Sequence, residues 1–258
     1  MRIVRFTPTD GGTAAYGVLE GEGADAVVAV LEQPPYDQVL RTGQVLPRGE
    51  VTLLAPVEPS KVLAFGRNYA EHAKELGNEV PEVPVVFSKP STAVVGDGAE
   101  VAYPALTQDL HFEGELAVVI GTRCRDVRAE DVAGVVLGYT VANDLTMRDR
   151  QRLEGQWTRA KGFDGSCPLG PWVETDLDPS ALSLRTTVNG AVRQDGTTAD
   201  MLHDVAACVA WVSAAMTLLP GDVVLTGTPA GVGPVVAGDE IAVTVEGIGT
   251  LTTRIGGG

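Results

Sequence analysis

Two apolar β-like runs with acids at their ends constrain this chain more than any other feature. Glu113-Gly-Glu115 stands directly before Leu-Ala-Val-Val-Ile, and Asp144 follows the apolar run 135–142. In a strand, residues two apart leave the same face, about 7 Å apart along the backbone, so Glu113 and Glu115 project together. If the second run lies beside the first, the Asp144 carboxylate closes the group from its far side. The pattern predicts three carboxylates that meet between two neighbouring strands.

A group of three carboxylates points to a bound cation. Like charges that share a space repel each other and raise their pKa values, and a dication removes both penalties. An all-carboxylate set favours Mg²⁺ or Mn²⁺, with Ca²⁺ as a possible substitute. We expect His111, on the Glu113 face, to be a neighbour rather than a ligand. A solvent-facing Glu-x-Glu on an edge strand and an Asn-Asp turn are the alternative interpretation.

Composition excludes some classes of partner. The 258 residues carry a net charge of −15, from 34 acids against 19 bases, and 44% of them are hydrophobic. Nucleic acids and anionic membranes need clustered Lys and Arg, so neither is expected as a partner. Three widely spaced cysteines without a Cys-x-x-Cys pair indicate reduced thiols. With no apolar run of membrane-spanning length, the chain is predicted to be cytoplasmic.

The chain is predicted to fold as two β-rich parts. Residues 1–58 hold short β-like runs between Gly-rich turns and form a small N-terminal β domain. A Pro-punctuated linker at 57–60 precedes the second domain, residues 59–258. The expected elements there are strands 62–65, 84–89, 112–121, 135–142, 222–226 and 240–255, helices 70–76, 146–154 and 205–218, and a hairpin at Asn189-Gly190. Residues 157–171 read as turn-rich.

Two segments outside the acidic group offer chemistry. His72 and Glu75 are three apart on the expected helix 70–76 and share a face. A histidine oriented by a carboxylate is the arrangement that a general base needs, although a solvated helix explains the same residues. Arg148, just after Asp144, can face an anion or be one more charge on a solvated helix, and the simplest interpretation of Lys161 is a surface lysine. The Gly-rich loop 227–233 lacks the spacing of a nucleotide site but can cradle a carboxylate.

Together these residues resemble the fumarylacetoacetate hydrolase family, in its short bacterial, acylpyruvase-like branch. The similarity runs from Lys61 to the end, and its motifs stand in the family order. They are Gly-Arg-Asn-Tyr-Ala-Glu-His (66–72), Lys-Pro-Ser (89–91), His-Phe-Glu-Gly-Glu-Leu-Ala-Val-Val-Ile-Gly (111–121), Gly-Tyr-Thr-Val-Ala-Asn-Asp (138–144), Ala-Lys-Gly-Phe-Asp (160–164) and Leu-Thr-Gly-Thr-Pro-Ala-Gly-Val-Gly (225–233).

The resemblance implies a fold, an assembly and roles for single residues. The fold is mixed α+β and predominantly β, a β-roll or β-sandwich with a few flanking helices, and the assembly is a homodimer. Mg²⁺ or Mn²⁺ is held by Glu113, Glu115 and Asp144. The resemblance gives the catalytic roles to His72 and Glu75 on a lid helix and to Lys161, and the substrate contacts to Arg67, Arg148, Gln151 and Thr228.

The resemblance also implies a reaction. We expect hydrolysis of a C–C bond in an acylpyruvate or fumarylpyruvate, with the metal stabilising the enolate that develops. In that reaction His72 activates water, while Lys161 and Arg148 hold the anionic 2-oxo acid. The motifs leave open a 2-hydroxyhepta-2,4-diene-1,7-dioate (5-carboxymethyl-2-hydroxymuconate) isomerase or an oxaloacetate decarboxylase. A cation-stabilised ligand-binding β protein is the alternative outside enzymes.

Overall fold

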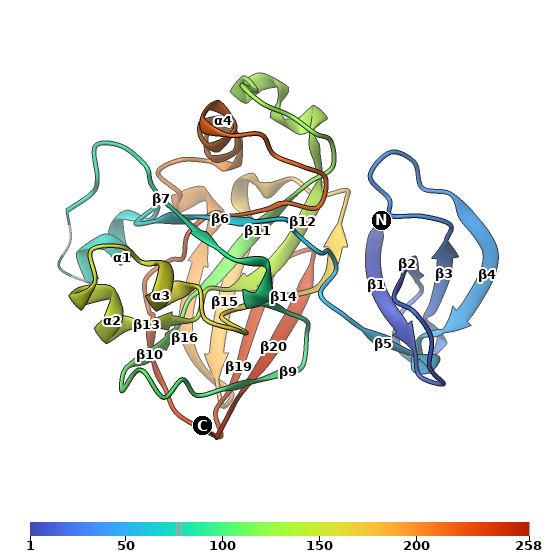
Figure 1. Cartoon of the computed structure of the whole chain (residues 1–258), viewed down its shortest axis with the longest axis horizontal. Helices are drawn as coiled ribbons and strands as arrows, with labels where there is room; N and C mark the ends of the chain where they lie inside the picture. The colour runs from blue at the N-terminus through green and yellow to red at the C-terminus, as the bar shows by residue number, and fades with distance from the viewer. Residues whose placement is uncertain (76, 78, 258) are drawn as a thin grey trace.

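Strands dominate the molecule, which confirms the predicted fold class. The computed structural model describes residues 1–75, 77 and 79–257. Figure 1 shows a small all-β unit in blue on one side and a larger body of packed sheets on the other, with short helices around it. No helix in these ranges is both long and apolar enough to cross a membrane.

The N-terminal unit consists of five strands and two single 3₁₀ turns. The strands are β1 (Arg2–Pro8), β2 (Ala15–Glu20), β3 (Val27–Leu31), β4 (Arg41–Pro47) and β5 (Val51–Leu53), and the turns span Gly23–Asp25 and Arg48–Glu50.

Among the described residues, the larger body contains the remaining strands and four α-helices. Its strands are β6 (Val62–Gly66), β7 (Val85–Lys89), β8 (Val94–Val95), β9 (Ala99–Ala102), β10 (Leu110–Phe112), β11 (Gly114–Ile120), β12 (Val136–Asn143), β13 (Thr146–Met147), β14 (Cys167–Glu174), β15 (Ser183–Val188), β16 (Ala191–Thr197), β17 (Val223–Leu225), β18 (Gly233–Val235), β19 (Glu240–Val245) and β20 (Gly249–Gly256). The α-helices are α1 (Ala70–Glu75), α2 (Arg148–Leu153), α3 (Thr158–Lys161) and α4 (Val205–Ala215). Short 3₁₀ turns span Ser91–Ala93, Ala129–Gly134, Pro179–Ala181 and Thr198–Asp200.

One long sheet joins the two parts of the chain. Its strands lie in the order β4-β3-β2-β1-β14-β12-β11-β17-β6-β7. The junction is the antiparallel pair β1 and β14, where Arg2 lies opposite Glu174 and Ile3 opposite Val173. The backbone hydrogen bonds of the N-terminal unit therefore continue into the body, although the unit also has its own apolar cluster around Phe6.

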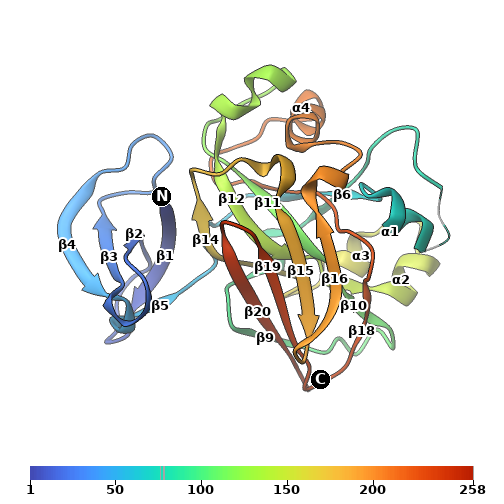
Figure 2. The same cartoon turned by 180° about the vertical axis from the view of Figure 1, so that it is seen from behind.

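A second sheet covers the long one and encloses the main core. It has the order β16-β15-β19-β20-β9, and Figure 2 shows it from the back of the molecule. Leu116 and Val118 of β11 pack in one cluster with Ile241 and Val243 of β19. A Cβ on Gly114 would lie 2.4 Å from Thr186 Oγ1. The glycine between the two glutamates thus lets the second sheet approach.

The predicted strand 112–121 is in fact two strands, divided at Glu113. β10 pairs with β13 and β18 in a three-stranded sheet, whereas β11 belongs to the long sheet. Glu113, between them, belongs to neither strand, although its C=O still accepts a hydrogen bond from Asp144 N–H at 2.8 Å. The division places the Glu113 carboxylate where the two sheets meet.

Two other segments differ from expectation, and the expected hairpin is present. Helix α4 ends at Ala215 rather than Leu218, because Leu218 pairs with Cys124 in a β-bridge. The segment that reads as turn-rich contains the one-turn helix α3 and the strand β14. The Asn189-Gly190 hairpin is confirmed between β15 and β16. Leu76 and Asn78, expected at the end of the first helix, lie outside the described residues.

Candidate active site

The acidic group of the sequence forms a single cluster. Pairing of β11 with β12 places Gly114 opposite Asn143, so Glu113, Glu115 and Asp144 converge from the adjoining strand ends. Ligand oxygens of the three acids lie within 4.8 Å of one another, and all three residues are buried, with 4%, 1% and 0% exposure. The predicted meeting of acids from two strands is confirmed.

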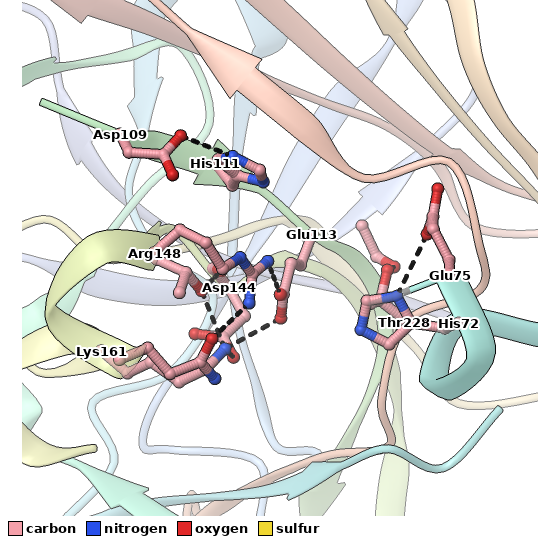
Figure 3. A network of polar contacts seen from close by, with 12 residues as sticks. His72, Glu75, Asp109, His111, Glu113, Asp144, Arg148, Lys161 and Thr228 are labelled. Carbon is pink, nitrogen blue, oxygen red and sulfur yellow. Dashed lines mark hydrogen bonds and ion pairs between the residues drawn. The ribbon is translucent and has the colours of Figure 1, made fainter. Parts of the chain in front are cut away.

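Three cationic side chains reach two of the three acids. Lys161 Nζ donates to Glu113 Oε2 at 2.8 Å and to Asp144 Oδ2 at 2.6 Å. Lys89 Nζ donates to Asp144 Oδ1 at 2.5 Å, and Arg148 forms an ion pair with Glu113. Figure 3 shows Lys161 and Arg148 reaching the acids from the same side. The two acids are therefore compensated by buried positive charge.

The two glutamates have opposite pKa shifts. Burial alone would raise the pKa of Glu113, but Lys161 and Arg148 outweigh it and hold the pKa well below its usual range. Burial, together with Asp144 and Glu113, raises the pKa of Glu115 well above its usual range. Among the described residues, Glu115 accepts a hydrogen bond from Gly227 N at 2.7 Å but has no cationic side-chain partner. Without a cation the Glu115 carboxyl therefore favours its neutral form, and a bound cation would favour the ionised form.

The donor set fits a hard divalent cation. Two oxygens on opposite sides of one Mg²⁺ lie about 4.2 Å apart, and on opposite sides of one Ca²⁺ about 4.8 Å apart, so the cluster needs little closure to share an ion. Carboxylate oxygens without thiol or imidazole ligands favour Mg²⁺, Mn²⁺ or Ca²⁺. His111, the nearest histidine in the sequence, instead places its Nε2 2.8 Å from Asp109 Oδ1. These three acids are the residues that would hold the metal.

Metal addition is expected to stabilise the fold. Because the ion binds the assembled cluster and not the unfolded chain, Mg²⁺ at one hundred times its Kd should add about 2.7 kcal/mol to the free energy of unfolding. Thermal unfolding of EDTA-treated protein with increasing MgCl₂ or MnCl₂ measures this effect, with KCl of equal ionic strength as the control. An unchanged Tm up to millimolar metal would contradict the metal assignment.

His72 and Glu75 face the same space from helix α1. His72 Nδ1 lies 3.5 Å from Glu75 Oε2. Both oxygens of Glu75 accept from Gly231 N–H at 3.1 Å, which ties the helix to the Gly-rich loop. Burial lowers the pKa of His72; Arg148 and Lys161 add to the shift, while Glu113 and Glu75 oppose it. A neutral imidazole held beside a carboxylate is chemically equipped to accept a proton.

A pocket of about 430 Å³ brings the predicted residues together. Of the ten site residues predicted from the sequence, nine line it: Arg67, His72, Glu75, Glu113, Glu115, Arg148, Gln151, Lys161 and Thr228. Asp144 lies behind the wall, bonded to Lys161 and Lys89. Figure 3 places His72 on the opposite side of Glu113 from Lys161 and Arg148, so a small molecule between them would meet both groups.

Three of the four predicted substrate-contact residues, Thr228, Gln151 and Arg148, also bond within the protein. Thr228 Oγ1 donates to Gly114 C=O at 2.7 Å and accepts from Gln194 Nε2 at 2.7 Å. Gln151 Oε1 accepts from Arg148 at 2.5 Å. Amides of the Gly-rich loop do cradle carboxylates, but those of the protein's own Glu115 and Glu75.

The amino-acid sequence also matches a known protein family. Residues 61–256 match the model described as fumarylacetoacetate (FAA) hydrolase C-terminal, which covers most of the chain and all ten predicted site residues. The chain belongs to the fumarylacetoacetate hydrolase family. Residues 1–56 match a second model, described as Rv2993c-like, N-terminal.

Relatives within the fumarylacetoacetate hydrolase family carry isomerase and tautomerase names. A solved structure described as 5-carboxymethyl-2-hydroxymuconate delta-isomerase from Mycobacterium smegmatis is 51% identical, with a TM-score of 0.94 and 100% of both chains covered. One described as 2-hydroxyhepta-2,4-diene-1,7-dioate isomerase from Mycobacterium marinum is 48% identical, with a TM-score of 0.92 over 100% of this chain and 98% of that one. Oxaloacetate tautomerase YcgM of Escherichia coli is 49% identical over 76% of this chain and 92% of its own length.

Sequence reasoning missed two kinds of residue in this family site. Lys89 was noticed only as part of Lys-Pro-Ser, yet its side chain is fully buried against Asp144. Trp157 and Phe87 line the pocket and contact each other edge to face, with ring centres 5.4 Å apart. Lys161 is 2% exposed rather than a surface lysine. The local signal for Lys89 is a lysine at the end of an apolar strand.

Proposed function

We propose that this chain is a cation-dependent isomerase that moves a proton within a 2-oxo acid. The observation that carries the proposal is a pocket lined by Glu113 and Glu115 of the buried carboxylate cluster and by His72, whose imidazole lies beside Glu75. The isomerase and tautomerase relatives support it, because both reactions move a proton without breaking a carbon–carbon bond. They favour the isomerase alternative over the predicted acylpyruvate hydrolysis, which stays a prediction, as do the homodimer and the cytoplasmic location.

The residues divide the work as follows. A bound dication supplies electrostatic stabilisation to the oxygen on which negative charge develops. Since His72 Nδ1 faces Glu75, Nε2 is the atom free to accept a proton from the carbon beside the keto group. The C–H bond breaks at that carbon, and the proton returns either to oxygen, giving the enol, or to a more distant carbon of a conjugated chain. Arg148 and Lys161 hold the anionic substrate during the transfer.

The enol-to-keto conversion of oxaloacetate tests the proposal directly. The loss of enol absorbance is followed with purified protein and Mg²⁺, and a parallel assay measures pyruvate release from an acylpyruvate. Arg41→Met serves as the control because Arg41 is exposed in the N-terminal unit and pairs with Glu20. Pyruvate release without tautomerisation would restore the hydrolase prediction, and the absence of both activities would refute a 2-oxo acid enzyme of either kind.

Replacement of Glu75 by Gln should move the pH profile as well as the rate. Gln can still accept from Gly231 N–H, but it loses the charge that raises the pKa of His72. We expect kcat to fall about tenfold or more, less than the 10²- to 10⁴-fold that the base itself contributes, and the acidic limb of kcat/KM to move to lower pH. A pH-rate series on both proteins measures this, and unchanged turnover would remove Glu75 from the mechanism.

A further inference from the structure

Arg67 differs from the other cations that line the pocket. Lys161 and Arg148 are bonded to the acidic cluster, and Arg152 lies 3.2 Å from Asp109. Over residues 1–75, 77 and 79–257, Arg67 makes no ion pair and no side-chain hydrogen bond, although it lines the same pocket and is partly buried. Its positive charge is therefore available to an anion that enters the pocket.

The backbone at Arg67 is held in a conformation that an arginine rarely adopts. Its φ is 57°, in the left-handed region, where a side chain with a Cβ costs about 1–2 kcal/mol. The next residue, Asn68, fixes the turn through its side chain: Nδ2 donates to His203 C=O and Thr226 C=O, both at 2.8 Å, and Oδ1 accepts from His203 N–H at 2.9 Å. Strain that the surroundings impose in this way is typical of functional positions.

An aromatic platform carries the guanidinium. The Arg67 Cζ lies 6.0 Å from the centre of the Trp157 ring. Trp157 can approach because residue 66 is glycine, where a Cβ would lie 2.7 Å from the indole. Phe87, which packs against Trp157, has Lys161 Nζ 4.9 Å from its own ring centre. A guanidinium that rests on a ring keeps its N–H edge free for a carboxylate, which it can bind through two parallel hydrogen bonds.

Resting on the proposed function, we propose that Arg67 and Trp157 bind the second carboxylate of a dicarboxylic 2-oxo acid. Glu113, Glu115 and Asp144 would hold the metal, which would attract the 2-oxo carboxylate end at a place where Lys161 and Arg148 are already paired with the protein's own acids. Arg67 supplies the unpaired positive charge for the other end of the substrate. The site thus selects diacids over 2-oxo acids that have an uncharged tail.

Matched pairs of simple 2-oxo acids test the proposal through equilibrium binding, without a rate measurement. 2-Oxoglutarate and 2-oxopentanoate share a carbon chain and differ in the far carboxylate, as do 2-oxoadipate and 2-oxohexanoate. Calorimetry of the Mg²⁺-loaded protein should show the diacid binding about 10- to 100-fold more tightly in at least one pair, the range for a charge-assisted bidentate contact. Arg67→Met should abolish this preference and leave the monoacid affinity within about twofold, because the metal end is untouched.

Three further variants separate the effect of the Arg67 charge from the effect of its backbone conformation. Arg67→Gly relieves the left-handed strain and should lose the preference as fully as Arg67→Met. Arg67→Lys keeps a positive charge without the planar fork and should retain part of it. Arg41→Met should behave as the wild type. Equal weakening of monoacid and diacid by Arg67→Met, or no diacid preference in either wild-type pair, would overturn the proposal.

The binding and turnover experiments distinguish a failure of the Arg67 site from a failure of the proposed function. A wild-type protein that prefers diacids through Arg67 but does not tautomerise oxaloacetate would refute the proposed function and keep the second-carboxylate site. A protein that tautomerises oxaloacetate with the same KM in wild type and Arg67→Met would refute this site and keep the function.

Discussion

Replacing Glu113 with Gln is expected to lower the free energy of unfolding of the metal-free protein by about 3–5 kcal/mol, because it leaves buried Lys161 and Arg148 beside a neutral amide. Glu115→Gln should leave it unchanged or raise it by up to about 1 kcal/mol, because the Glu115 pKa is raised and its charge is unfavourable in the empty cluster. Urea unfolding in EDTA at pH 7 measures both, and equal losses would contradict this charge assignment.

The loss of unfolding free energy caused by Glu113→Gln should become smaller at low pH. The pKa of Glu113 is lowered by folding, so its ionised form stabilises the native state above the ordinary value of 4.5, and this stabilisation is lost as the pH falls further. The difference in the free energy of unfolding between wild type and Glu113→Gln therefore decreases as the pH falls below 4.5. Both variants should bind Mg²⁺ at least tenfold more weakly in calorimetry, since each loses one anionic ligand.

The acidic cluster could be predicted because its signal is local and periodic. Spacing of two placed Glu113 and Glu115 on one face, and the neighbouring apolar run supplied the strand that brings Asp144. The break at Glu113 could not be read in the same way. It arises because residues 110–112 pair with β13 and β18, and both of these strands lie far from residues 110–112 in the sequence.

Lys161 and Lys89 show why long-range charge pairing escapes a reading of the sequence. Helix α3 has four residues, too few to carry a helical pattern, and Lys161 is buried only because Glu113 and Asp144 stand 48 and 17 residues away in the chain. Lys89 is likewise fixed by Asp144, 55 residues along. Sequence motifs identified the family, but they did not separate hydrolysis, isomerisation and decarboxylation, because one metal-stabilised enolate would serve all three.

Strand β14 was missed for a different reason. Its Pro168, Gly170 and Pro171 are turn residues by local preference, yet the segment forms ladders with β1, β8 and β12. A shift of register between Tyr139 and Val141 accommodates the interruption. Tertiary pairing overrides local preference here, and the same strand carries the junction to the N-terminal unit.

His72→Asn should lower kcat about 10²- to 10⁴-fold, the usual contribution of a positioned base. Asn cannot accept the proton, but its small amide leaves the carboxylate cluster and the Arg67 side of the pocket in place. The affinities for Mg²⁺ and for oxalate should therefore stay within about threefold of the wild-type values. His203→Asn is the matched control, because His203 contacts Asn68 through its backbone and does not line the pocket. Steady-state kinetics with oxaloacetate, together with calorimetry of oxalate, measures both effects.

The pH dependence gives the same experiment a second readout. Folding lowers the pKa of His72 below its ordinary 6.5, mainly through burial, so the imidazole stays neutral to lower pH than a free histidine. In the wild type, kcat/KM should therefore fall only as the pH drops below 6.5 toward this lowered pKa, when the base becomes protonated. The residual activity of His72→Asn should lack that limb. An acidic limb that persists unchanged in His72→Asn would assign the proton transfer to another group, and a full rate in the variant would exclude His72 as the base.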